Sequence, residues 1–228
     1  SVTHELTDAL GLHGSSIDFP GSDDILTIDE QNQVSAATTH TDNRWPDFSF
    51  GSGAWCIEFW VRYETWSGTP AVFSWGAYES GTNNIWTQTN SSMFLGFTVK
   101  TNGVAQTTPS LAGAPALDTW YHIALSGLGA DYGSKVYSFV NGVNLGNSVI
   151  TNMPVIERRP VFGSLKLTND SDDQDFNGQL DEIRVTKGHP RYTVDGKNFA
   201  GIVPDGAVGY AGVTGTSIPT SPYLRPTP

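Results

Sequence analysis

The sequence predicts an all-β protein in which two antiparallel sheets stack face to face. Short apolar segments recur about every ten residues, and turns rich in glycine and asparagine separate them. No segment sustains the roughly 3.6-residue periodicity of an amphipathic helix. Only 15% of the residues are charged and 25 are glycine, which suits tight turns between strands better than long helices.

The expected strands follow in chain order. The first two lie at 16–19 and 25–28, and the polar stretch 29–53 after them is interpreted as a long connection. Further strands are expected at 54–63, 70–76, 84–88, 92–99, 119–126, 134–141, 158–163 and 176–186. The dipeptide Asn141-Gly142 predicts a tight hairpin between two strands, and Gly178 predicts a bend or a close backbone approach in the last one.

The strand at 54–63 has the clearest period-2 alternation. One side carries Trp55, Ile57, Phe59 and Val61, and the other carries Cys56, Glu58, Trp60 and Arg62. Trp60 and, further along the chain, Trp120 are expected to supply large apolar bodies to the sandwich core. Cys56 is the only cysteine, which excludes an intramolecular disulfide and a CxxC zinc site. Its apolar neighbours favour a buried core residue over a reactive thiol.

The chain of 228 residues is expected to form one domain, because all-β sandwiches of this size commonly fold as a unit. Residues 1–14 are interpreted as an N-terminal extension and 15–200 as the domain. From 201 to 228 proline, glycine, serine and threonine dominate. Proline donates no backbone hydrogen bond, so this segment is expected to be an extended C-terminal arm rather than a central strand.

The formal net charge of −11 makes nucleic acid and anionic membrane surfaces poor partners. It is compatible with neutral glycans, basic protein surfaces and bound cations. No run approaches the roughly 18 apolar residues that cross a bilayer. No signal peptide is visible, but the sequence starts at Ser1 without methionine, so processing of the N-terminus and export stay open.

Four segments in a fixed order resemble a known family. They are residues 16–25, 56–62, 120–124 leading to 136–142, and 176–185. Together they resemble the laminin G-like branch of the concanavalin A-like lectin/glucanase superfamily, and this resemblance implies a two-sheet antiparallel jelly-roll sandwich. The ending at 181–193, with the letters DEIRVTKGHPRYT, resembles the version of the domain found in bacteriophage and marine viral structural proteins.

No catalytic arrangement is recognised. Glucanases of the resembled superfamily carry a Glu-x-Asp-x-x-Glu pattern on one strand, so that two carboxylates flank one glycosidic bond. That spacing is absent, and the adjacent Asp181 and Glu182 would point to opposite faces of a regular strand. The five histidines are scattered, and His122 is interpreted as structural. A nonenzymatic protein is therefore expected.

A calcium site is one of two interpretations of the acidic loop at 169–175. Clustered carboxylates repel one another unless they are solvated or bridged by a cation, and oxygen ligands suit Ca²⁺. A rim site would take Asp170, Asp172 and Asp173, and a second would take Asp23 and Asp24 with Asp181. The other interpretation is a solvated loop without metal.

A glycan site is expected to combine exposed aromatic rings with amide partners. The sequence has seven tryptophans, and several aromatic residues fall near loops or strand ends beside asparagines. The candidates for this site are Trp45, Trp66, Tyr78, Trp86, Asn83 and Asn84.

Two functions stay open. The first is a nonenzymatic laminin G-like module on a virion surface, such as a phage capsid decoration or tail-associated protein with adhesive capacity. The arm at 201–228 would anchor it to other virion proteins, and homo-oligomers are compatible with this interpretation. The alternative is a carbohydrate-binding lectin module of a secreted or cell-surface protein.

Overall fold

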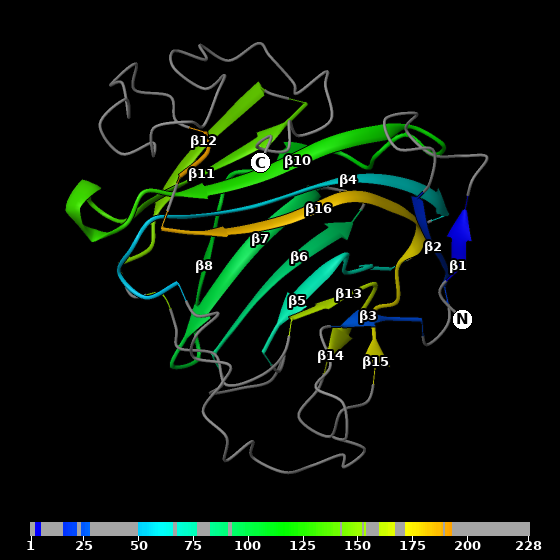
Figure 1. Ribbon diagram of the computed structural model, residues 1–228, viewed down its shortest axis with the longest axis horizontal. Coiled ribbons are helices and arrows are strands. Elements are labelled where there is room, and N and C mark those ends of the chain that lie inside the picture. Colours follow the sequence, from blue (N-terminus) through cyan, green and yellow to red (C-terminus); the bar gives the residue numbers. More distant parts are fainter. Residues whose placement is uncertain are drawn as a thin grey trace, which may run out of the picture.

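The fold is a two-sheet antiparallel sandwich, and a computed structural model provides its coordinates. The structure describes residues 3–5, 16–21, 24–27, 50–65, 68–76, 83–90, 93–141, 143–151, 153, 160–166, 172–188 and 190–192. Its two large sheets lie one over the other (Figure 1). The predicted fold class is thereby confirmed.

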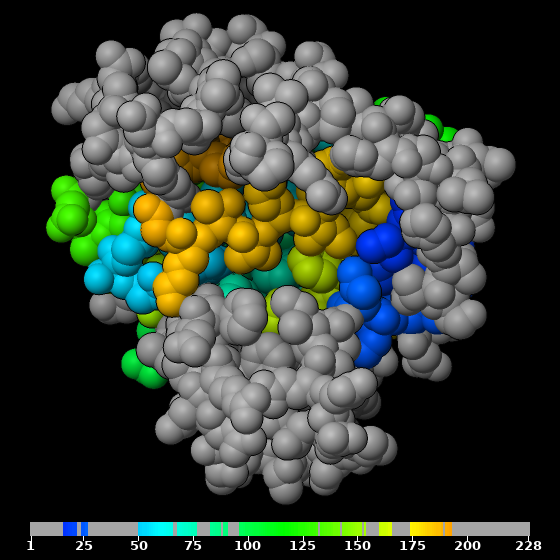
Figure 2. Space-filling model, in the orientation of Figure 1, coloured from blue at the N-terminus to red at the C-terminus, as the bar shows by residue number. Residues whose placement is uncertain are grey.

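The first large sheet, called sheet A, has seven strands. In spatial order they are β1 (Thr3–Glu5), β2 (Ser16–Pro20), β16 (Asn177–Lys187), β4 (Trp55–Thr65), β10 (Trp120–Gly127), β11 (Lys135–Val140) and β12 (Val143–Val149). Because β1 pairs with β2, part of the expected N-terminal extension contributes to the sheet. The atoms of β16, yellow to orange, cross the middle of the molecular face, with β2 in blue beside them (Figure 2).

The second large sheet, called sheet B, packs against sheet A. Its strands in spatial order are β3 (Leu26–Thr27), β13 (Pro160–Phe162), β5 (Phe73–Trp75), β6 (Asn84–Asn90), β7 (Met93–Thr101) and β8 (Val104–Thr107), and β9 (Leu111–Ala112) also pairs with β7. A separate small ladder joins β14 (Leu165–Lys166) to β15 (Asp172–Asp173). The expected arm at 201–228 lies outside the described residues.

The Asn141-Gly142 hairpin is confirmed, since β11 pairs antiparallel with β12 and Asn141 has a positive φ of 50°. The second strand of this hairpin, β12, was implied by the prediction, but no residue range was assigned to it. Val143, Leu145 and Val149 fall on one side of its period-2 pattern, but Asn147 interrupts that side, and Val143 and Val149 are exposed, so the apolar signal is weak. Strand β12 forms because β11 offers it a hydrogen-bonding edge.

The core lies between the sheets and contains one side of β4, namely Trp55, Ile57, Phe59, Val61 and Tyr63. Trp75 of β5 and Phe97 of β7 face them from sheet B. The expectation that Trp60 and Trp120 fill the core is wrong. Both alternate with core residues along their strands, so they lie on the outer face of sheet A and are half-buried there.

Gly178 permits a close approach between the backbones of β16 and β4. Its φ is +151°, and a Cβ added there would collide with the carbonyl oxygen of Arg62. The pairing of β16 with β4 shifts register at this position. The predicted close backbone approach at Gly178 is therefore confirmed.

Among the described residues, no helix is long and apolar enough to cross a membrane.

Replacing Gly178 with alanine is expected to lower the free energy of unfolding by roughly 2–4 kcal/mol, because the new methyl group meets rigid backbone at a strained φ. Gly53→Ala is the control, since its added Cβ would meet only the Phe50 carbonyl oxygen, at 3.6 Å. Denaturant unfolding of the two variants measures the difference. Equal stabilities would contradict the assigned role of Gly178.

Candidate functional site

A buried carboxylate organises the outer face of sheet A. Glu58 is 0% exposed and its Oε1 lies 2.7 Å from Nε of Arg191 and 3.5 Å from Nη1 of Arg184. The hydroxyl of Tyr192 donates a 2.6 Å hydrogen bond to Oε2, and Nε2 of His122 lies 3.6 Å from the same oxygen. We call Glu58 and these four partners the Glu58 cluster.

The Glu58 cluster holds the segment Pro190–Tyr192 against the sheet. Tyr192 also packs with Cys56, Ala124 and Phe139 in an apolar cluster on this outer face, where Cys56 is buried as expected. The chain that follows β16 thus folds back over the sheet it has just completed. Three residues of the motif at 181–193, Arg184, Arg191 and Tyr192, meet on Glu58, so the motif has a direct role in folding.

The charge of Glu58 is stabilised in place. Burial by itself would raise the pKa of Glu58, but neighbouring His122, the charge of Arg191 and the hydroxyl of Tyr192 hold that pKa below its usual value. Glu58 and His122 are 0% and 1% exposed. A substrate therefore cannot reach this carboxylate–histidine pair, and its chemistry is that of a structural ion cluster.

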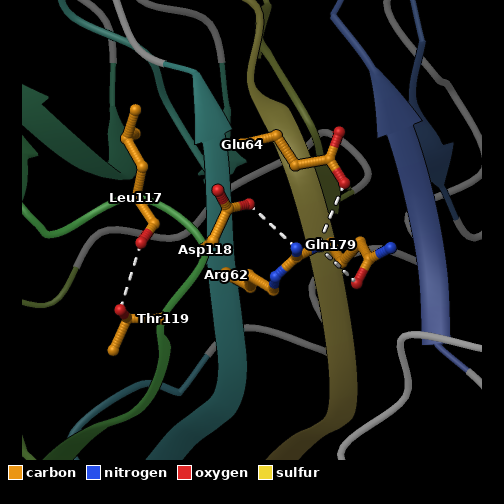
Figure 3. Close-up of polar contacts among 6 residues, drawn as sticks. All are labelled: Arg62, Glu64, Leu117, Asp118, Thr119 and Gln179. Carbon is orange, nitrogen blue, oxygen red and sulfur yellow. Dashed lines mark hydrogen bonds and ion pairs between the residues drawn. The ribbon is translucent and has the colours of Figure 1, made fainter.

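A second polar cluster lies further along β4, where the face opens to solvent. Arg62 Nη2 lies 2.8 Å from Oδ1 of Asp118, and Nη1 lies 3.1 Å from Oε1 of Glu64. Nη1 also donates a 3.3 Å hydrogen bond to Oε1 of Gln179. Figure 3 shows the guanidinium held between Asp118 on one side and Glu64 and Gln179 on the other.

The loop that carries Asp118 is fixed by backbone hydrogen bonds at both ends of its turn. The backbone N–H of Asp118 donates to the carbonyl of Tyr63 at 2.8 Å, and that of Ala116 donates to the hydroxyl of Tyr121 at 3.0 Å. Thr119 Oγ1 donates to the carbonyl of Leu117 at 3.1 Å, as Figure 3 also shows. Asp118 is thus presented to Arg62 by an ordered loop, although its side chain is 65% exposed.

Two tryptophans flank Arg62. Strand register places Trp120 opposite Arg62 and Trp60 opposite His122, so the two indoles are diagonal neighbours on the outer face. The ring of Trp60 lies 5.2 Å from that of His122, and both tryptophans are half-buried. The name Arg62 surface is used below for Trp60, Arg62, Glu64, Asp118, Trp120 and Gln179.

The Arg62 surface combines two kinds of group that bind sugars. Partly exposed indole faces can stack on the C–H face of a pyranose or furanose ring. The fixed carboxylates of Asp118 and Glu64 can accept hydrogen bonds from hydroxyl groups. Small-ligand sites in proteins likewise combine aromatic side chains with a few placed polar groups.

Of the expected glycan residues, the three that the structure describes, Trp86, Asn83 and Asn84, do not belong to this surface. Trp45, Trp66 and Tyr78 lie outside the described residues. Trp86 is 5% exposed and packs with Ala71 and Leu165, so its ring is not the exposed platform that was expected. Asn84 is 1% exposed, and Asn83 accepts a 2.8 Å hydrogen bond from the backbone N–H of Asn102 at the β7–β8 turn.

The expected metal ligands are only partly described. Asp23 and Asp170 lie outside the described residues, and Asp172 and Asp173 form β15 rather than a loop. Asp24 is 6% exposed, and Asp181 accepts a 2.7 Å hydrogen bond from the backbone N–H of Glu182. Within the described part of the chain, no three histidine, cysteine, aspartate or glutamate side chains are grouped to hold a metal ion.

The geometry of Asp181 and Glu182 differs from a regular strand. The register of β16 against β4 shifts between Asp181 and Arg184, and Glu182 has a positive φ of 51°. The expectation of opposite faces assumed unbroken alternation, which this bulge interrupts.

A family model described as the concanavalin A-like lectin/glucanases superfamily matches residues 35–189. The sequence has no detectable relative among curated proteins.

Solved structures share the architecture at low sequence identity. Domain 4 of AbnA, a GH43 extracellular arabinanase from Geobacillus stearothermophilus in complex with arabinotriose, is 13% identical with a TM-score of 0.52, over 83% of this chain and 77% of that one. NanB, a Streptococcus pneumoniae sialidase solved with Optactamide, is 9% identical with a TM-score of 0.52, over 76% and 26%. The CBM40 of Ruminococcus gnavus IT-sialidase is 12% identical with a TM-score of 0.47, over 70% and 89%. At such identities the likeness shows the fold alone.

Replacing Glu58 with glutamine is expected to cost about 3–5 kcal/mol of stability at pH 7, because two arginines lose a buried anion. The folded-state pKa of Glu58 lies below the ordinary value of 4.5. Its contribution is therefore complete above about pH 4.5 and is lost as the pH falls through the folded-state pKa. Wild-type stability should fall in acid more steeply than that of the variant.

Thermal unfolding at pH 7 and in stepped acid buffers measures both effects. Glu64→Gln is the matched control, since Glu64 lies on the same strand and face but its side chain is 37% exposed. A Glu58→Gln protein as stable as wild type at pH 7 would contradict the proposed contribution of the Glu58 cluster to stability.

Proposed function

The chain belongs to the concanavalin A-like lectin/glucanase superfamily, and we propose that it is a noncatalytic carbohydrate-binding module. The observation that carries this proposal is the pair of half-buried tryptophans, Trp60 and Trp120, beside the fixed polar groups of the Arg62 surface. The arabinanase domain that shares the fold is bound to arabinotriose, which adds support from a structure.

The binding mode that we propose begins with stacking on the indoles. Trp120 lies at the first position of β10, next to the exposed loop that ends at Thr119, and we propose its ring as the place where a sugar first approaches. Hydroxyl groups would then donate to Asp118 and Glu64, whose positions are set by Arg62. Because these groups are held before binding, little side-chain entropy is lost on association.

The noncatalytic part of the proposal rests on where the carboxylates lie. Glycosidases need an accessible acid and an accessible base or nucleophile on opposite sides of one bond. Of the carboxylates in the Glu58 cluster and the Arg62 surface, Glu58 is enclosed by cations and is 0% exposed, while Glu64 and Asp118 both lie against the same guanidinium. Incubation with β-glucans and arabinans without product release would agree with this; released oligosaccharides would overturn it.

A virion location is a more specific proposal. Its support is the resemblance of the ending at 181–193 to viral structural proteins, together with the acidic surface and the proline-rich segment 201–228, which could anchor to other virion proteins. The alternative is a lectin module of a secreted or cell-surface protein. Virion genes beside the coding sequence would favour the first, and a secretion locus with glycan-degrading enzymes would favour the second.

Calcium binding at the acidic segment is a separate proposal. It is supported by the density of carboxylates at 170–173, and hard oxygen ligands of this kind suit Ca²⁺. Calorimetric titration of the EDTA-treated protein is expected to give a saturable isotherm and a raised melting temperature. The control replaces Asp170 and Asp172 with asparagine. A flat wild-type isotherm with an unchanged melting temperature would eliminate the site.

Replacing Trp120 with alanine is expected to weaken binding of a neutral oligosaccharide by roughly tenfold or more, because the stacking surface is lost. Val149→Ala is the control, since Val149 is exposed at the far edge of sheet A on β12. Titration of arabino- and gluco-oligosaccharides, read by intrinsic fluorescence, measures the affinities. A Trp120→Ala protein that binds like wild type would exclude this surface as the sugar site.

A further inference from the structure

We propose that the Arg62 surface selects neutral sugars and rejects acidic ones, and that Asp118 and Glu64 are the specificity determinants. The inference rests on the proposed function, since it names the class of glycan that the same surface would bind. It follows from the existing partners of Arg62. A protein arginine binds the carboxylate of an acidic ligand best through a bidentate hydrogen bond, for which its N–H groups have to be available.

Both terminal nitrogens of Arg62 already contact carboxylates. Nη2 lies 2.8 Å from Asp118, and Nη1 lies 3.1 Å from Glu64 while also donating to Gln179. A sugar carboxylate would have to displace one of these internal partners to reach the guanidinium. The Arg62 side chain is only 15% exposed, so little of its charge is offered to solvent.

The surrounding charges act in the same direction. Gln179 is paired on its other side with Asp18 of β2, and Asp181 of β16 is paired with Trp60. Among the described residues, strand register thus places Asp18 and Asp181 on the same face of sheet A as Arg62, Glu64 and Asp118. A sugar carboxylate brought to Arg62 would be repelled by the carboxylates of Asp118 and Glu64 beside it, and this repulsion is screened by salt.

A neutral sugar meets no such obstacle. Its hydroxyls can donate to the outer oxygens of Asp118 and Glu64 while both stay paired with Arg62. The side chains of Asp118 and Glu64 are 65% and 37% exposed, so they are accessible to a ligand. The pairing of Arg62 with Asp118 and Glu64 thus disfavours an acidic sugar and also holds two carboxylates in place as hydrogen-bond acceptors for the hydroxyl groups of a neutral sugar.

Asp118→Asn gives a direct test. The substitution would keep the loop, since asparagine tolerates the positive φ of 54° found there, but it would release Nη2 of Arg62 from its ion pair. The matched control is Asp131→Asn, which removes the same charge in the 3₁₀ turn beyond the opposite end of β10. Adding Glu64→Gln to Asp118→Asn would release both terminal nitrogens.

The probes are a neutral oligosaccharide, such as arabinotriose or lactose, and the acidic sialyllactose and trigalacturonate. Wild type is expected to bind a neutral probe at least about tenfold more tightly than either acidic one, with the gap narrowing at high salt. Asp118→Asn should gain affinity for the acidic probes by about fivefold or more, and the double variant should gain further, whereas Asp131→Asn should not.

The outcomes separate the two proposals. Wild type that binds an acidic probe as tightly as the neutral ones would overturn the selectivity while leaving carbohydrate binding intact. An equal gain in Asp131→Asn would assign the effect to net charge and would also overturn the role of Asp118. Wild type and variants that bind none of the probes would overturn carbohydrate binding at this surface together with its selectivity.

Discussion

The packing of the outer face of sheet A depends on one buried carboxylate, that of Glu58. Glu58 stands on the outward side of a central strand, where an ionised group could not remain without partners once it is covered. Its partners come from β10, from β16 and from the segment that follows β16. The Glu58 cluster therefore ties three parts of the chain, distant in sequence, to one position, and it covers the outer apolar cluster around Cys56 with Tyr192.

The same strand carries three environments along its length. Its inward side is core throughout, from Trp55 to Tyr63. Its outward side begins with buried Cys56 and the enclosed charge of Glu58. It ends at Arg62, whose side chain is 15% exposed, and Glu64, whose side chain is 37% exposed. Strand alternation alone decides which side chains point inward and which point outward. The burial of the outward side chains, in contrast, depends on the segment that folds back over them. Among the described residues, the outward side of β4 becomes more exposed beyond Pro190–Tyr192.

This division explains what the sequence could reveal. The two sheets, the main strands and the inward side of β4 follow from local alternation and turn chemistry, which act over a few residues. The same alternation predicts that Trp60 and Arg62 lie on one side of β4. Assigning Trp60 to the core was inconsistent with that pattern. Asp118 and Gln179 carried no sequence signal, because their meeting with Arg62 depends on pairing between strands far apart in the chain. The bulge after Asp181 was equally invisible, since a register shift leaves the residue types unchanged.

The motif at 181–193 illustrates why a family signature is a weak guide to function. Arg184, Arg191 and Tyr192 contact Glu58, a carboxylate that is closed to solvent. A domain with this segment would need these contacts for its structure whatever its function. Residues of the Arg62 surface differ in this respect. Asp118 and Glu64 contribute nothing to the core and stand where solvent and ligands can reach them. Ligand choice can therefore change through such positions while the fold persists, and an interpretation of function has to begin from the open end of the face.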